Sequence, residues 1–207
     1  LLFAWSGAMA AMVTESLLVM FMALELAWLP MIALVAIDSR RLSSSESSLK
    51  AFFAHAFASL IFAHGIAFIF GATGRLDLGA LSTSGTDSSL LFGVGLTLIL
   101  VGLLARGAVA PFHPWSPDVH EGAPSFVTTH IATIAQASTF FVLLRVLHSA
   151  LDPNSGVMGG YADRVPTLLG VLGVIGLIWG HAMALVQVGL RRLVGWLGVG
   201  QVGFFVL

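Results

Sequence analysis

Charged side chains are rare inside the apolar segments of this sequence, where only Glu25, Arg106 and Arg145 occur apart from Lys50 at the start of one segment. A charge at the centre of a bilayer costs at least about 2.5 kcal/mol on insertion scales, so each of them needs a physical reason. Glu25 lies mid-segment in LELAWLP, where Pro30 frees the carbonyl of Leu26 one turn from the carboxylate. We expect Glu25 to be a protonatable station; the plainer alternative is a carboxylate held by hydrogen bonds for packing alone.

Arg106 precedes the proline-rich stretch APFHPWSPDVHEGAP, residues 110–124. Such a stretch between apolar runs predicts a broken helix, because non-helical backbone at membrane depth is tolerated only where protein or water covers it. We expect Arg106 to set the proton affinity of Glu25 or of a neighbouring site. The alternative is an arginine that snorkels to the interface, and snorkelling alone suffices for Arg145 near the end of its segment.

A polar stripe runs along the segment 124–148. Four of its side chains recur at helical spacing on one face, namely Ser125, Thr129, Thr133 and Gln136. His130 lies at the edge of that face. A polar face in a membrane helix must meet protein or water, so the stripe either lines a hydrated path or joins helices by hydrogen bonds. The sequence leaves both alternatives open.

Other kinds of chemistry find little support in the sequence. The histidines show no metal-ligand spacing such as HxxxH, and there is no cysteine, so we expect no metal and no iron–sulfur cluster. His55 and His64 lie about half a turn out of phase and cannot both face one path. The sequence has no phosphate loop, GxGxxG or GxSxG motif, so we expect no catalytic residue and no cofactor in this chain.

The elements that position these residues are long apolar runs. Hydrophobic residues make up 57% of the 207 and charged residues 9%, which predicts a polytopic membrane protein without a nucleic-acid partner. The runs are continuous and do not alternate, so we expect an all-α transmembrane bundle. Seven membrane segments are expected, at 1–13, 16–37, 49–71, 89–109, 124–148, 166–188 and 193–207.

The ends of the chain suggest a fragment. The sequence begins LLFAW without Met and ends GQVGFFVL inside an apolar run. We therefore expect residues 1–207 to form a single membrane domain cut from a longer protein, with its first and last segments truncated. Any function of this chain is then one in which the piece takes part.

The positive charges cluster on one side of the expected bundle. Five of them lie in or beside the segments 38–48 and 189–192, namely Arg40, Arg41, Lys50, Arg191 and Arg192. The loops 72–88 and 149–165 hold only Arg75 and Arg164. The positive-inside rule then predicts cytoplasmic loops at 38–48 and 110–123. For the serine run SSSESS, residues 43–48, we favour a solvated loop over a helix cap.

Several stretches together resemble one family. PFHPWSPDVHEGAPS resembles the signature of the broken helix in the antiporter-like subunits of respiratory complex I, and its PDVHEGAP is closest to subunit N of the bacterial NADH:quinone oxidoreductase. LELAWLP, LKAFFAHAFASLIFAHGIAFIFGATG, LLRVL and GLRRLVGW match in the same order and spacing, over essentially the whole chain. The resemblance implies inverted repeats of five helices, each with one broken helix, here near Pro111.

The resemblance also implies a proton path. Glu25 matches the family glutamate, Arg106 the lysine paired with it, and Gln136 a second lysine, while Gln201 stands where a histidine is frequent. Arginine does not release its proton and glutamine carries none, so relay through Gln136 would need water, Thr133 or His130 instead. The expected hinge of the broken helix consists of Pro111, His113, Pro114 and Pro117.

The resemblance implies a membrane subunit that contributes to proton translocation coupled to quinone reduction. It would lie in the cell inner (plasma) membrane among other membrane and peripheral subunits, which would hold the redox cofactors and the quinone. One alternative is a cation/proton antiporter-type module of a hydrogenase or inorganic-carbon uptake complex, since a fold alone does not fix function. Another is a non-conducting structural subunit, which Arg106 and Gln136 favour.

Overall fold

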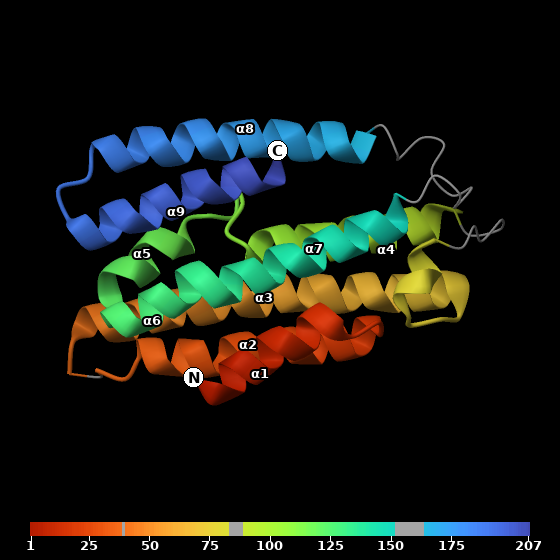
Figure 1. Cartoon of the computed structure of the whole chain (residues 1–207), viewed down its shortest axis with the longest axis horizontal. Coiled ribbons are helices and arrows are strands. Elements are labelled where there is room, and N and C mark those ends of the chain that lie inside the picture. Colours follow the sequence, from red (N-terminus) through yellow and green to blue (C-terminus); the bar gives the residue numbers. More distant parts are fainter. Residues whose placement is uncertain (39, 83–88, 152–163) are drawn as a thin grey trace.

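A computed structural model describes residues 1–38, 40–82, 89–151 and 164–207. Its helices run roughly along one long axis (Figure 1). In chain order they are α1 (Leu2–Val13), α2 (Leu17–Val35), α3 (Leu42–Thr73), the 3-10 turn η1 (Leu78–Leu81), α4 (Ser89–Arg106), α5 (Trp115–Gly122), α6 (Ser125–His130), the π-helical turn η2 (Ile131–Ala135), α7 (Gln136–Ala150), α8 (Arg164–Leu185) and α9 (Leu190–Val206). The only β-type pairing in the described residues is an isolated bridge between Ser16 and Asp77.

Four helical stretches of the described residues are long and apolar enough to cross a membrane, namely Leu17–Val35, Leu42–Thr73, Ser125–Ala150 and Arg164–Leu185. The expected all-helical, polytopic membrane fold is therefore confirmed. Two further apolar helices are shorter, Leu2–Val13 and Leu90–Arg106. The count of seven membrane segments includes such shorter helices and stays a prediction.

The backbones of α3 and α4 approach each other closely, and Arg106 lies at the end of α4. A Cβ built on Gly65 of α3 would lie 2.7 Å from the backbone nitrogen of Ile99 in α4. Small residues allow membrane helices to approach this closely, and the contact is filled on either side by the buried side chains of Phe62 and Leu103. This packing fixes the position of the end of α4, where Arg106 lies.

The serine run 43–48 is helical, so the prediction of a solvated loop is wrong. The helix α3 begins at Leu42, and Ser44 and Ser47 are buried. The Ser44 hydroxyl donates to the Val35 carbonyl at 2.5 Å. The last carbonyls of a helix lack partners within it, and this hydroxyl satisfies one at the end of α2. The segment 38–48 is thus a short connection followed by the first turns of α3.

The segment 110–123 is also more than a loop. The helix α4 ends at Arg106, Ala108 has a φ of 58°, and the Ala110–Pro111 peptide bond is cis. The chain becomes helical again in α5, which packs against both α3 and α9. Pro117 falls in the first turn of α5, where a backbone N–H has no helical partner to lose. The predicted helix break is therefore present, with a short buried helix inside it.

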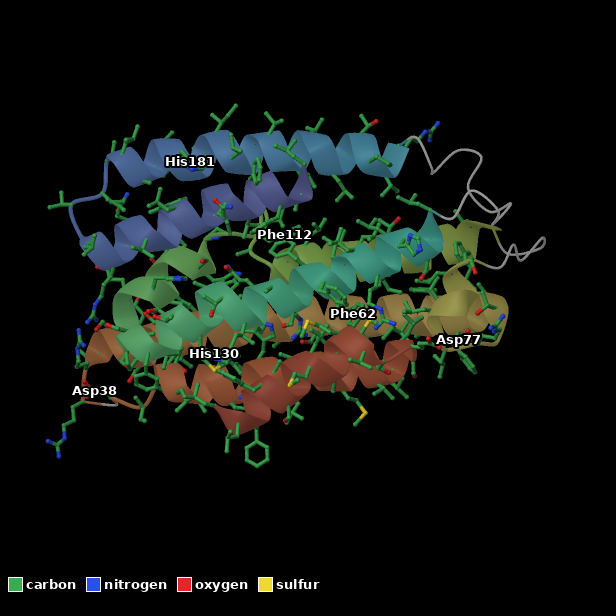
Figure 2. The ribbon with its side chains drawn as sticks, in the orientation of Figure 1. Asp38, Phe62, Asp77, Phe112, His130 and His181 are labelled. Carbon is green, nitrogen blue, oxygen red and sulfur yellow. The ribbon has the colours of Figure 1, made fainter. Side chains whose placement is uncertain are left out.

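The charged connections gather at the two ends of the bundle. Figure 2 shows Asp38, which follows α2, and Asp77, which precedes η1, at opposite ends. The turn between α8 and α9 lies at the Asp38 end (Figure 1). Residues 83–88 and 152–163, which include parts of the expected loops 72–88 and 149–165, lie outside the described residues.

Candidate functional site

A buried ion pair joins α2 to α4. The Arg106 Nη2 atom lies 2.5 Å from the Glu25 Oε1 atom. The Arg106 side chain is fully buried, whereas 23% of the Glu25 side chain is exposed. Arg106 is thus held inside the bundle and does not snorkel, and Glu25 is the member of the pair that reaches the surface.

Ser59 of α3 completes this cluster. Its Oγ atom lies 2.6 Å from Arg106 Nη2 and 2.5 Å from Glu25 Oε1. It also lies 2.7 Å from the His55 carbonyl, so the single hydroxyl proton has two competing acceptors. The sequence analysis missed Ser59, although a serine in the middle of an apolar segment signals a hydroxyl that must find a partner.

Aromatic rings surround His55 next to this cluster. The His55 ring centroid lies 4.0 Å from that of Trp28 on α2 and 4.6 Å from that of Trp115 on α5. The Trp28 indole donates to the Thr139 hydroxyl of α7 at 3.4 Å. These contacts connect the ion-pair cluster to α5, the helix inside the break.

A second set of polar side chains lines a cavity of 560 Å³ between α7 and α9. Thr133, Gln136, Gln201 and His120 line it together with apolar side chains such as Phe140. Gln136 is buried, and neither its Nε2 atom nor His120 Nε2 has a hydrogen-bond partner among the residues that the structure describes. Two polar side chains of the predicted path, Thr133 and Gln136, therefore share one cavity, which Glu25 does not line.

His130 faces elsewhere. Its Nδ1 atom accepts a hydrogen bond from the Trp5 indole of α1 at 2.9 Å, and Figure 2 shows it on the side of the bundle that holds α1 and α2. Six residues separate His130 from Gln136, so their side chains would lie about 120° apart even in a regular helix. The π-helical turn Ile131–Ala135 between them does not bring them onto one face. His130 and Gln136 consequently point to different neighbours, and the structure does not bring them together.

The expected hinge residues pack against the last two helices. The His113 ring centroid lies 5.4 Å from that of Trp196 on α9. A Cβ built on Gly195 of α9 would lie 2.7 Å from the Pro117 Cα atom, so α9 touches the hinge backbone directly. The neighbouring hinge residues Pro111 and Pro114 lie in the connection between α4 and α5, where the helix is interrupted.

Ion pairs hold α5 between α3 and α9. Asp118 of α5 lies 2.7 Å from Lys50 Nζ of α3 and 3.4 Å from Arg192 Nη2 of α9. Arg192 also lies 3.3 Å from Glu121. The basic residues that predicted one end of the bundle therefore meet the acids of the helix inside the break.

The prediction that Arg145 snorkels is wrong. Its Nη1 atom donates to the carbonyls of Met12 at 2.8 Å and Thr14 at 2.5 Å. These carbonyls lie at the end of α1, where they lack helical partners. Arg145 of α7 thus caps the end of α1, which is a structural role.

The described residues contain no cluster of three or more His, Cys, Asp or Glu side chains that could hold a metal ion.

Residues 14–207 match the family described as NADH:quinone oxidoreductase/Mrp antiporter, TM. The chain belongs to this family. NADH-quinone oxidoreductase subunit N of Saccharopolyspora erythraea is 37% identical over 211 residues, which cover 100% of this chain and 39% of that relative. The subunit N of Mycobacterium tuberculosis is 35% identical over 205 residues, covering 97% of this chain and 37% of the relative. The chain thus spans less than half the length of these relatives.

Solved structures agree with this assignment. A chain of respiratory complex I from Thermus thermophilus matches with a TM-score of 0.81 and 35% identity, over 98% of this chain and 42% of that chain. A chain of the Mrp complex from Dietzia matches with a TM-score of 0.88 but 22% identity, over 100% of this chain and 38% of that one. The second likeness shows a shared fold alone. The resemblance to the antiporter-like membrane subunits is confirmed.

Proposed function

We propose that this chain is part of a membrane subunit of an NADH:quinone oxidoreductase and contributes to proton translocation coupled to quinone reduction. The observation that carries the proposal is the Glu25–Arg106 pair, a protonatable acid held against a fixed cation inside a membrane fold. The identity of 35–37% to proteins named subunit N supports the choice of complex.

The pair can act through its geometry. In one state of the proposed scheme Arg106 lies against Glu25, as it does in the structure. In the other state a conformational change moves the guanidinium away and Glu25 takes up a proton. Alternation between the two states would release and reload a proton at Glu25, driven by free energy delivered from other subunits. Arg106 acts electrostatically in this scheme, because arginine does not exchange its own proton.

The proposed setting follows the family. We infer that the chain forms the first of two inverted repeats and the start of the second, in the cell inner (plasma) membrane. The end that holds Arg40, Lys50 and Arg192 would face the cytoplasm, which makes the connections at 38–48 and 110–123 cytoplasmic. Other membrane and peripheral subunits would supply the quinone site and the redox cofactors.

The test replaces Glu25 by Gln in the full-length subunit. Glu25→Gln keeps the size of the side chain and an oxygen that accepts hydrogen bonds, but the amide cannot take up and release a proton. NADH-driven proton uptake by inverted vesicles should therefore fall sharply while the complex still assembles. Glu15→Gln is the control, because Glu15 is an exposed acid outside the cluster. Unchanged uptake in an assembled Glu25→Gln complex would support the non-conducting structural subunit instead.

The antiporter-type module of another complex remains the second candidate, because the Mrp chain shares the fold. Mild-detergent purification of the full-length protein with mass spectrometry decides between them. Recovery with flavin, iron–sulfur and quinone-site subunits is the expected result. Recovery with hydrogenase, carbon-uptake or antiporter subunits would contradict the NADH-dependent assignment.

A further inference from the structure

We propose that His55 is the proton acceptor for Glu25, so that the ring nitrogen Nε2 takes up the proton which the carboxyl group releases. The inference rests on the proposed function, since it names the next station of the same site. It follows from the contacts around Glu25 and from a cavity that Glu25 and His55 share.

The other neighbours of Glu25 do not serve as an acceptor. Arg106 stays protonated and has no lone pair to offer. The Ser59 hydroxyl is already engaged with Glu25, Arg106 and a backbone carbonyl, and a hydroxyl can pass a proton on but not keep an extra one near neutral pH. A proton that leaves Glu25 therefore needs a basic group beyond this cluster.

The hydrogen bonding of His55 leaves such a group free. Its Nδ1 atom lies 2.9 Å from the Ala51 carbonyl, which can only accept a hydrogen bond. Nδ1 therefore carries the proton in the neutral ring, and Nε2 carries the lone pair. The residue is 3% exposed, and in the described part of the chain its buried Nε2 atom has no hydrogen-bond partner. A buried lone pair of this kind is costly unless something uses it.

A cavity links the two groups. Glu25 and His55 both line a space of 110 Å³ at the flank of α2 and α3, together with Trp28 and Phe52. A water molecule in the liquid occupies about 30 Å³, so the space has room for about three. A short water chain there would connect a carboxyl oxygen to the His55 ring, and a small rotation of the ring would have to bring the buried Nε2 atom to it.

Two indole rings flank His55, with centroid distances of 4.0 Å to Trp28 and 4.6 Å to Trp115, and an indole face stabilises a positive charge. Burial and the nearby Arg106 cation oppose a charge on the ring, so the imidazolium of this proposal is a short-lived state. The charged groups of this region are Glu25 from α2, which lines the same space as His55, and Arg106 from α4, which pairs with Glu25. The acids of α5, Asp118 and Glu121, are paired with Lys50 and Arg192 at the end of the bundle.

The transfer balances as follows. The O–H bond of protonated Glu25 breaks, an N–H bond forms at His55 Nε2, and the products are a carboxylate and an imidazolium. The carboxylate is stabilised by Arg106 at 2.5 Å. The same guanidinium repels the new imidazolium, which favours onward release of the proton and keeps the station from becoming a trap.

The test compares two histidines of α3. His55→Gln removes the titratable ring but retains an amide that can bond the Ala51 carbonyl. His64→Gln is the matched control, because His64 bonds the Leu60 carbonyl in the same way, at 2.7 Å, yet is exposed. In vesicles that hold the full complex, we expect His55→Gln to lower NADH-driven proton uptake at least tenfold and to flatten its pH profile, with His64→Gln unchanged.

The outcomes separate the two proposals. Loss of uptake in Glu25→Gln with normal uptake in His55→Gln would overturn the role of His55 and leave the proposed function standing. Normal uptake in both variants would overturn both. An independent measurement uses the unaltered complex, with isotope-labelled histidine in the infrared difference spectrum on NADH addition. We expect an imidazole protonation band that Glu25→Gln abolishes, and a spectrum without this band would overturn the inference even if His55→Gln fails to assemble.

Discussion

At the scale of residues, the choice of arginine at position 106 separates two tasks that lysine can combine. Lysine can hold a charge and also release its proton when it is desolvated, whereas arginine only holds the charge. The fully buried guanidinium donates to Glu25, Ser59 and the Leu24 carbonyl, so it is also a packing element. In the proposed mechanism, proton exchange therefore occurs on the acid side of the pair.

Substitutions of Arg106 test this division. Arg106→Ala leaves the Glu25 carboxylate without its partner, and breaking a buried pair typically costs about 3–5 kcal/mol. We expect poor assembly or strongly reduced proton uptake. Arg106→Lys keeps a cation in place and adds an exchangeable proton, so uptake should be retained or rise. NADH-driven uptake per assembled complex measures both, and equal loss in the two variants would show that only the guanidinium geometry matters.

The sequence was informative about Glu25 and Arg106 for a physical reason. Ionised side chains in apolar segments have few ways to be stabilised, so scarcity itself predicts that they pair. Ser59 and His55 were harder to assign, because neutral polar side chains can satisfy themselves on the backbone of their own helix. Both in fact contact the carbonyl four residues earlier, and only the packing of α2 and α5 on α3 shows their further role.

At the scale of elements, the approach of α3 to α4 sets the geometry of the cluster, because Ser59 lies on one helix and Arg106 on the other. Gly65 makes the closest approach that a side chain would disturb. Its neighbours there are backbone atoms of Gly95 and Ile99, which cannot rotate away.

Two glycines of α3 therefore predict opposite results. Gly65→Ala places a methyl group 2.7 Å from the Ile99 backbone nitrogen, so the helices must separate, at a cost of about 1–3 kcal/mol. Gly71→Ala meets only the Leu91 side chain at 3.5 Å, and alanine favours the helix by up to about 1 kcal/mol. Thermal melting of the purified complex should fall for the first and hold or rise for the second. Equal melting temperatures would mean that the contact is not tight.

Helix boundaries were the least predictable elements. Hydropathy ends a segment at the first polar run, so the serines 43–48 and the stretch 110–123 were expected to be loops. The structure continues α3 through the serines and forms α5 in the second stretch. Both depend on partners distant in sequence, such as the Val35 carbonyl for Ser44 and Lys50 for Asp118, which no local pattern contains.

At the scale of the whole molecule, Asp118 of α5 joins two parts of the bundle: α3, which precedes the interrupted helix, and α9, which packs with α8. It contacts Lys50 of α3 and Arg192 of α9 simultaneously. Asp118 and Trp115 thus form a continuous series of contacts from α9 through α5 to the ring of His55. This connection is electrostatic and partly exposed, so it should depend on salt.

Asp118→Asn tests the connection. We expect a loss of about 1 kcal/mol in stability at low salt, because two partly exposed pairs are lost together, and a smaller loss at high salt. Glu46→Gln is the matched control, since Glu46 pairs with Lys50 within α3 and does not bridge helices. Melting temperatures at two ionic strengths measure the difference. Identical behaviour of the two variants would argue against a bridge.

The π-helical turn Ile131–Ala135 has a consequence for motion. A π turn holds one extra residue and can move along the helix by one turn. The side chains in the stretch through which it moves then rotate by about 100°, while both ends of the helix stay in place. The flanking contacts of His130 with Trp5 and of Thr139 with Trp28 lie on the two sides of this turn. Gln136, directly after it, is therefore the side chain whose direction can change by torsion while the bundle around it keeps its shape.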